Sequence, residues 1–283
     1  MKTKSFRHAC MRSTFAWVIV LAAAPGITAN AELVYGVSDQ LGELVSFDSA
    51  TPGNLLSAHA LTGMVSGEQI RGIDQIGGTL YGLGDQNHLY TINPNTGSVT
   101  MVGSGFTPVL NGVDFGFNAG TSQLYVSSDL GQNLTINPAT GTATAGPNYS
   151  GATSSLDSLA YNYVNGNFYA VSASTQDLYL VNPTTGAVTL IGATGVAFVD
   201  RIGLDISGAT DIAYFSGTVS GQTEFFTVNL ATGAMTLVGD VGTPGEFSSG
   251  LDSIAVAGTV PEPGTVALLA VGGLLFGLLR RKK

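Results

Sequence analysis

The sequence predicts an all-β fold, a five-bladed β-propeller that occupies residues 32–257. The first observation is a turn motif, Asn-Pro-x-Thr-Gly or a close variant, that recurs about every 45 residues along the chain. The second is that the full repeats contain short apolar runs sufficient for four strands. The third is a lone strand-like run near the end, 251–256, with no second strand after it. A strand-rich repeat of this length is typical of propeller blades.

Each position of the turn motif has a physical reason. Asn or Asp at the first position bonds the backbone two residues further on, proline presets φ, and glycine accepts a positive φ. The apolar runs on both sides make each copy a hairpin. An unrelated set of hairpins in a β-sandwich is the alternative, and the fixed period argues against it. The copies begin at Asp48 (degenerate), Asn93, Asn137, Asn182 and Asn229 (without proline).

The runs at the two ends predict how the ring closes. The first repeat supplies three strands, beginning with 33–37, and lacks an innermost one. We therefore expect 251–256 to pair with 33–37, so that the C-terminal strand completes the N-terminal blade and no sheet edge stays free inside the ring. A six-bladed ring would need about 45 more residues. The innermost strands expected for the other blades are 72–76, 112–115, 156–161 and 202–206.

Residues 1–31 have the three parts of a secretory signal peptide. Basic residues come first, an apolar segment (15–24) follows, and Ala29-Asn30-Ala31 is an Ala-x-Ala cleavage pattern. We expect signal peptidase to cut before Glu32. A retained membrane helix is the alternative, which the short apolar core disfavours. The only cysteine, Cys10, lies in this leader, so the exported body has no thiol chemistry.

Residues 258–283 contain a second export signal. Pro261-Glu262-Pro263 precedes an apolar segment, 265–279, and a basic tip, 280–283. This order of parts resembles the PEP-CTERM protein-sorting signal. The resemblance implies a Gram-negative, exopolysaccharide-producing bacterium, transient anchoring in the inner membrane by a C-terminal transmembrane helix, and an exosortase that removes or exchanges the tail. It implies a final location at the cell surface or outside the cell. An ordinary single-pass anchor is the alternative, although the apolar segment is shorter than the ~20 residues of a typical span.

The body also resembles a family of secreted bacterial domains of unknown function. The matching features are the blade opening Gly72-Ile73-Asp74, the Leu80-Tyr81 strand and the repeated turn. The resemblance covers most of residues 32–257 and implies a propeller that is often followed by the same kind of sorting tail. It implies no activity for named residues.

Without its two ends the chain is strongly acidic. Eight of its ten basic residues lie in the leader and the tip, so residues 32–262 contain Arg71 and Arg201 against nineteen acidic residues, a formal charge of −17 with no lysine. Such a surface repels phosphate backbones, which excludes nucleic acid as a partner. It attracts divalent cations, or it simply keeps an exported protein soluble.

One repeated residue type suggests a site. An aspartate occurs near the start of every predicted innermost strand, and innermost strands line the axis of a propeller. We expect a ring of carboxylates there, compensated by Ca²⁺ or by Arg71 and Arg201. The alternative is that each aspartate accepts backbone N–H groups at a blade junction. The five residues are Asp74, Asp114, Asp157, Asp205 and Asp252.

Other signals for chemistry are weak. His59 and His88 lie in different blades with no acidic residue at a metal-like spacing, which argues against zinc. No nucleophile elbow or phosphate loop occurs, and the strand tyrosines are expected to pack between blades. We therefore expect a non-catalytic binding protein that contacts extracellular polysaccharide or another exported protein. The alternative is a polysaccharide lyase or hydrolase that uses the channel carboxylates.

Overall fold

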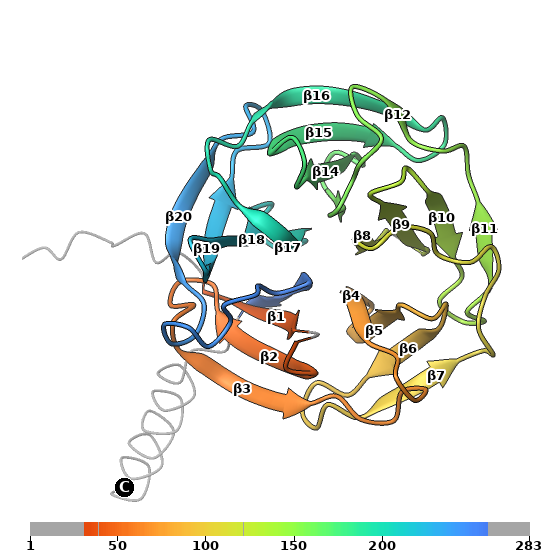
Figure 1. Ribbon diagram of the computed structural model, residues 1–283, viewed down its shortest axis with the longest axis horizontal. Coiled ribbons are helices and arrows are strands. Elements are labelled where there is room, and N and C mark those ends of the chain that lie inside the picture. Colours follow the sequence, from red (N-terminus) through yellow and green to blue (C-terminus); the bar gives the residue numbers. More distant parts are fainter. Residues whose placement is uncertain (1–30, 39, 121, 260–283) are drawn as a thin grey trace, which may run out of the picture.

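The computed structural model describes residues 31–38, 40–120 and 122–259, and this part of the chain contains strands and no helix. Five sheets are arranged around a common axis (Figure 1). The innermost strand of each sheet contacts the innermost strands of its neighbours. The predicted all-β, five-bladed propeller is therefore confirmed.

The blades follow one another along the chain, and the strands of each blade are named from the axis outward. Blade 1 contains β21 (Ser253–Thr259), β1 (Glu32–Ser38), β2 (Glu43–Asp48) and β3 (Leu55–Ala60). Blade 2 contains β4 (Ile70–Ile76), β5 (Thr79–Gly84), β6 (Leu89–Ile92) and β7 (Val99–Val102). Blade 3 contains β8 (Phe115–Ala119), β9 (Leu124–Ser128), β10 (Asn133–Ile136) and β11 (Ala143–Ala145).

Blade 4 has a fifth strand on its outer edge. It contains β13 (Ala160–Tyr161), β14 (Phe168–Ser172), β15 (Asp177–Asn182), β16 (Ala187–Ala193) and the added β12 (Ser150–Gly151). Blade 5 contains β17 (Val199–Ile206), β18 (Ala213–Val219), β19 (Gln222–Val228) and β20 (Met235–Asp240). Strand β12 belongs to the link from blade 3 and pairs with β16 in parallel.

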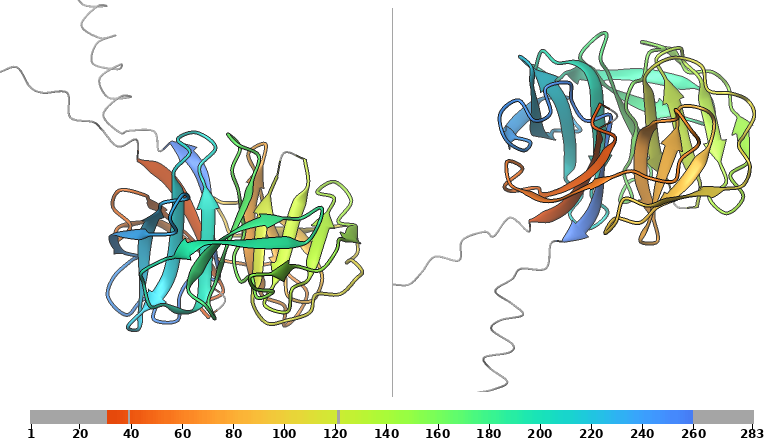
Figure 2. Two further views of the ribbon diagram at one scale, coloured as in Figure 1. Left: turned by 90° about the horizontal axis from the view of Figure 1, so that it is seen from above. Right: turned by 60° about the horizontal axis from the view of Figure 1, so that its bottom comes forward.

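The ring closes as the apolar runs at the two ends of the body predicted. Strand β21 pairs antiparallel with β1, with Val37 opposite Ser253 and Glu32 opposite Thr259. The described chain therefore starts and ends side by side at one face of the ring (Figure 2). We call this pairing, together with its contacts to blade 5, the seam.

Three innermost strands begin later than the sequence suggested. Strand β8 begins at Phe115 rather than at residue 112, β13 at Ala160 rather than at 156, and β21 at Ser253 rather than at 251. Gly112 and Gly250 have φ of 105° and 93°, which is not extended backbone. Asp157 and Ser158 both direct their N–H to one carbonyl, that of Val171, so they form no regular ladder. The chain therefore enters these blades as loops.

The repeated turn holds neighbouring blades together. The side chains of Asp48, Asn93, Asn137, Asn182 and Asn229 each accept the N–H two residues on, at 2.7–3.0 Å. The turn glycines of blades 2 to 5 have φ of 70–86°, and a Cβ there would collide with backbone of the preceding blade's outer segment: Gly97, Gly141, Gly186 and Gly233. The glycine is thus required both by its dihedral angle and by this close approach.

Apolar side chains fill the junctions between blades. Five buried clusters occur, and each combines residues of two adjacent blades. At the seam, for example, the ring of Phe47 in blade 1 packs edge-on against the ring of Phe225 in blade 5, with 5.1 Å between the ring centroids. The strand tyrosines Tyr90, Tyr169 and Tyr179 are buried in these clusters, as expected. Burying one Val, Leu, Ile or Phe side chain of these clusters contributes about 1.5–3 kcal/mol.

Both export signals fall mainly on residues outside the described part of the chain. The predicted signal peptide, 1–31, contributes only Ala31 to it, and the predicted C-terminal helix and the Pro261-Glu262-Pro263 motif contribute nothing. Within the described ranges no helix has the length and hydropathy to cross a membrane.

Candidate functional site

Strand pairing shows which residues are equivalent between blades. In every blade one residue of the innermost strand lies opposite a tyrosine of the second strand. The pairs are Asp74–Tyr81, Asn118–Tyr125, Ala160–Tyr169, Asp205–Tyr214 and Ala255–Tyr35. Only Asp74 and Asp205 of the five predicted aspartates occupy this position. The expectation that all five share one place in the repeat is corrected by this register.

Asp74, Asn118 and Asp205 form a lower group that joins blades through backbone. Asp74 accepts the N–H of Ala119 at 2.5 Å, and Asp205 accepts that of Val256 at 2.7 Å. Asn118 accepts the N–H of Tyr161 at 2.8 Å. Each acceptor thus binds the innermost strand of the next blade. Asn118 also donates to Asp205 at 3.0 Å, which links the non-adjacent blades 3 and 5.

Burial governs the protonation of this lower group. It raises the pKa of Asp205 to about 6, although three hydrogen bonds oppose the shift. Burial, followed by repulsion from Asp205, also raises the pKa of Asp74 well above its ordinary value. Both carboxyl groups are held by fixed N–H donors, which is the capping role considered for the aspartates as an alternative to a ligand ring.

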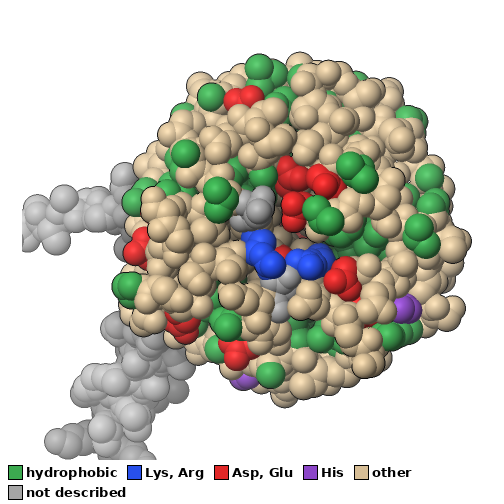
Figure 3. All heavy atoms as spheres, viewed as in Figure 1, with side chains coloured by type: hydrophobic (Ala, Val, Ile, Leu, Met, Phe, Trp, Pro, Cys, Tyr) green, Lys and Arg blue, Asp and Glu red, His purple; other side chains and the backbone are tan. Residues whose placement is uncertain are grey.

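The other three aspartates lie at the opposite end of the innermost strands, together with both arginines. Arg71, Asp114, Asp157, Arg201 and Asp252 line a hollow at the centre of the face seen in Figure 3. We call this hollow the mouth. The structure therefore brings five of the seven predicted residues together and places Asp74 and Asp205 elsewhere.

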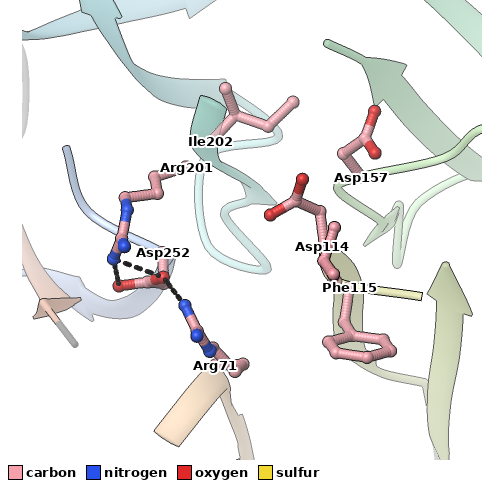
Figure 4. Close-up of a pocket in the computed structure, with 8 residues that line it drawn as sticks. Arg71, Asp114, Phe115, Asp157, Arg201, Ile202 and Asp252 are labelled. Carbon is pink, nitrogen blue, oxygen red and sulfur yellow. Dashed lines mark hydrogen bonds and ion pairs between the residues drawn. The ribbon is translucent and has the colours of Figure 1, made fainter. Parts of the chain in front are cut away.

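The mouth is divided by charge. Arg71 and Arg201 both direct Nη1 to Asp252 Oδ1, at 3.1 and 3.3 Å, and Arg71 Nε lies 3.7 Å from Asp85. Asp114 and Asp157 lie on the other side (Figure 4). Arg201 has φ of 59°, a backbone conformation that costs free energy for a residue with a side chain.

The mouth carboxyl groups are also shifted by burial. It raises the pKa of Asp252 to about 6 even though both arginines act in the opposite direction. The pKa of Asp157 is raised to about 6 by burial and by repulsion from Asp114 and Asp129, against a hydrogen bond from the N–H of Ala173. Asp114 is half-buried.

The space at the mouth is shallow along the axis and wider beside it. The central hollow holds about 10 Å³, enough for one water molecule. An adjoining cavity of about 320 Å³ shares Arg71, Val113 and Phe115 with it and reaches Asp85 and Gln86. A ligand larger than one water molecule would therefore occupy the adjoining cavity beside the central hollow.

The two histidines lie away from the mouth residues. His59 is on β3, and His88 bonds the buried Glu68 at 2.9 Å. Glu68 also accepts the hydroxyl of Tyr90 at 2.5 Å, and burial raises the pKa of that tyrosine to about 12. In the described part of the chain no three His, Asp or Glu residues are arranged to hold a metal ion.

Sequence reasoning missed Asn118 and Glu68. Asn118 had a signal, because Gly116-Phe117-Asn118 matches Gly72-Ile73-Asp74 and Gly203-Leu204-Asp205. Glu68 had none, because it lies 20 residues from His88.

Comparison with known proteins identifies the family of the chain and its sorting motif. A family model described as Domain of unknown function (DUF4394) matches residues 43–251, most of the chain. The chain belongs to the DUF4394 family. The PEP-CTERM protein-sorting motif matches residues 259–283 of this DUF4394 protein. It is therefore exported, associated with the cell envelope of a Gram-negative bacterium, and processed by an exosortase. No curated protein sequence matches the chain.

Solved structures resemble the DUF4394 body in fold alone. A chain of the nidogen/laminin complex is 11% identical with a TM-score of 0.50, covering 80% of this chain and 98% of that one. A Bacteroides thetaiotaomicron protein of unknown function is 14% identical with a TM-score of 0.49, covering 74% of this chain. This chain spans 58% of that protein. Myxococcus xanthus glutaminyl cyclase is 12% identical with a TM-score of 0.47, covering 69% and 95%.

Proposed function

We propose that this protein is a non-catalytic binding module of the cell surface or matrix, and that its mouth contacts an extracellular polysaccharide. The observation that carries the proposal is that the only two basic residues of the exported body, Arg71 and Arg201, both lie at the mouth, with Asp114 and Asp157 across from them. A sugar hydroxyl both donates and accepts hydrogen bonds. Guanidinium groups and carboxylates offer fixed donors and acceptors for such groups.

The surroundings of the charged groups suit a sugar ring as well. Val113, exposed over 70% of its surface, and Phe115 line the same cavity as Arg71. The exposed Val113 offers apolar surface to the C–H face of a ring, beside the polar groups that fix its orientation, whereas Phe115 is 7% exposed and forms the wall of the cavity. The strained backbone at Arg201 is a further sign of function, since such strain concentrates at binding sites.

The mouth is also well placed for display. The innermost strand β21 begins beside Asp252 at the mouth and ends at Thr259, the last described residue. The seven residues of this strand span about 20 Å, which is the distance between the mouth and the end of the chain at Thr259. While the sorting tail is anchored in the inner membrane, the mouth would face away from that membrane.

A polysaccharide-acting enzyme is the second candidate. The observation in its favour is the raised pKa of Asp157, about 6, next to Asp114, because an acid that is protonated near neutral pH suits glycosidic cleavage. The enzyme would act through these two carboxyl groups, and its turnover would distinguish it from a binding module.

Binding and cleavage are tested on one panel. The processed protein is passed over immobilised neutral, acidic and amino-sugar polysaccharides, and each retained glycan is then assayed for new reducing ends. We expect retention without cleavage. Asp114→Asn and Arg201→Gln should each weaken retention about tenfold, the loss of one charged hydrogen bond. The control Asp240→Asn, exposed on β20, should not change it.

Each other result rejects part of the proposal. Glycan cleavage by the wild-type protein that is lost in the Asp157→Asn variant would establish the enzyme instead. Retention that is insensitive to both mouth variants would move the site elsewhere, and no retention by any glycan would reject the binding role.

A further inference from the structure

Glu32 holds the seam through a fully buried carboxylate. It lies at the start of β1 with 0% exposure. Its Oε2 accepts hydrogen bonds from Tyr214 at 2.8 Å and Thr210 at 3.0 Å, and its Oε1 accepts one from Ser207. All three donors belong to blade 5. A glutamate of blade 1 therefore joins the first and last blades of the ring.

The backbone nitrogen of Glu32 also has a fixed hydrogen-bond partner. Glu32 N donates to Ser49 Oγ at 2.9 Å, and Ser49 N donates back to Glu32 O at 2.9 Å. Both the charged side chain and the amide of Glu32 are thus held in place by blades 1 and 5.

The titratable groups that interact with Glu32 or with its hydrogen-bond partner Tyr214 are acidic. They are the carboxyl groups of Glu32 itself, Asp48 on β2 and Asp205 on β17, and the phenol of Tyr214 on β18. Glu32 raises the pKa of Asp205, and burial followed by Glu32 and Asp48 raises that of Tyr214. The body has no lysine, and its two arginines lie at the mouth. The seam therefore gathers negative charge without a side-chain cation of its own.

We propose that the chain's own processed N-terminus is this missing cation, so that cutting between Ala31 and Glu32 places an α-ammonium group in the seam. The inference rests on the cut before Glu32 that the signal-peptide pattern predicts, and it is independent of the proposed polysaccharide binding. Water adds across the Ala31–Glu32 peptide bond, the new carboxylate leaves with Ala31, and the amine on Glu32 takes up a proton. That nitrogen keeps its bond to Ser49 and acquires a positive charge among carboxylates.

An order of events follows. The residue after the cut bond is completely buried in the closed seam, where a peptidase has no access to it. The seam closes only when β21, the last strand of the body, has been exported. Cleavage therefore precedes ring closure, and the closed ring is stabilised by the group that cleavage created.

The pH dependence has a definite sign. An α-amino group in an unfolded chain has a pKa near 7.7–8.0. In the folded state burial lowers this pKa and the nearby carboxylates raise it, and the proposal requires that the effect of the carboxylates is the larger. The stabilisation is then complete below about pH 7.7 and is lost as the pH rises through the folded-state pKa.

The test compares two forms of the exported chain, residues 32–283 and residues 29–283, purified in detergent with the tail intact. We expect the form that begins at Glu32 to melt about 4 °C higher at pH 7, a shift typical of one favourable interaction in a domain of this size. The gap should close by about pH 10. Glu32→Gln in both forms should reduce the gap, and Asp240→Asn in both should leave it unchanged.

A direct measurement complements the melting curves. Reductive methylation with ¹³C-formaldehyde labels the α-amine, and its NMR titration in the folded protein should give a pKa above the unfolded range. Equal melting temperatures, a gap that persists at pH 10, an unshifted amine or a host protein whose first residue is not Glu32 would each overturn the inference. Because Glu32 and the mouth lie at opposite ends of the blades, glycan retention would be unaffected by such a failure.

Discussion

The lower group and the mouth use aspartate in two different settings. Asp74 and Asp205 are bound by backbone N–H groups of neighbouring strands, so their partners are as fixed as the sheets themselves. Asp252 is bound by two half-buried arginine side chains, whose partners can be exchanged. Burial is similar in both settings, at 4–7% exposure for these residues. The kind of donor, and not the depth, therefore distinguishes Asp74 and Asp205 from Asp252.

The largest effect is expected from Asp205→Ala. Removing this carboxylate leaves the N–H groups of Ile206 and Val256 and the amide of Asn118 without their acceptor. At about 1–3 kcal/mol for each of the three unsatisfied buried donors, the free energy of unfolding should fall by roughly 3–9 kcal/mol. Urea unfolding followed by circular dichroism measures this change. The same substitution at Asp114 in the mouth should cost less than about 1 kcal/mol, and equal losses would remove the distinction.

The double variant Arg71→Gln/Arg201→Gln should have the next largest effect. It leaves Asp252 buried without a cation, and a loss of about 2 kcal/mol at pH 7.5 is expected because the arginines are partly exposed. Adding Asp252→Asn should restore most of it. If the triple variant is as unstable as the double one, the arginines stabilise the fold by packing rather than by charge.

Asp157→Asn should stabilise the protein at neutral pH. The folded-state pKa of Asp157 is about 6 against an ordinary 3.8, so its ionised form opposes folding above pH 6. In the wild type, stability should rise as the pH falls through 6 toward 3.8. The variant should gain about 1–2 kcal/mol at pH 7.5 and show a flatter profile between pH 5 and 7.5. An unchanged slope would contradict the assignment.

The smallest effect is expected from Asp114→Asn. Its stability should stay within about 0.5 kcal/mol of the wild type. The pKa of Asp157 should fall because the repulsion from Asp114 is lost. Carboxyl NMR of the two proteins measures that shift. A rise in the pKa of Asp157 would show that the two groups do not interact as described.

The fold was predictable because local chemistry and long-range spacing agreed. The Asx bond of each turn is encoded within three residues, and all five copies form it. The first blade lacked an innermost strand, and the lone run at 251–256 was the one segment left to fill that position beside 33–37. Strand β21 occupies it. The period of the repeat then fixed the number of blades.

The site was harder to predict because the key pattern occurs twice in blade 3. Gly112-Val113-Asp114 and Gly116-Phe117-Asn118 both resemble Gly72-Ile73-Asp74, four residues apart. Only the pairing of Asn118 with Tyr125 decides between them. Sequence alone therefore treated Asp114, and not Asn118, as the equivalent of Asp74 and Asp205. The contact of Glu68 with His88, which spans two segments of blade 2, left no local pattern.

The place where the chain leaves the ring determines how the protein responds to pulling. Tension applied at Thr259 acts along the axis of β21, so the ladders with β1 and the contacts with β4 and β17 resist it together. Breaking many hydrogen bonds at once takes more force than opening them one after another. A propeller tethered by this end would thus resist a pulling force with the load distributed over three blades.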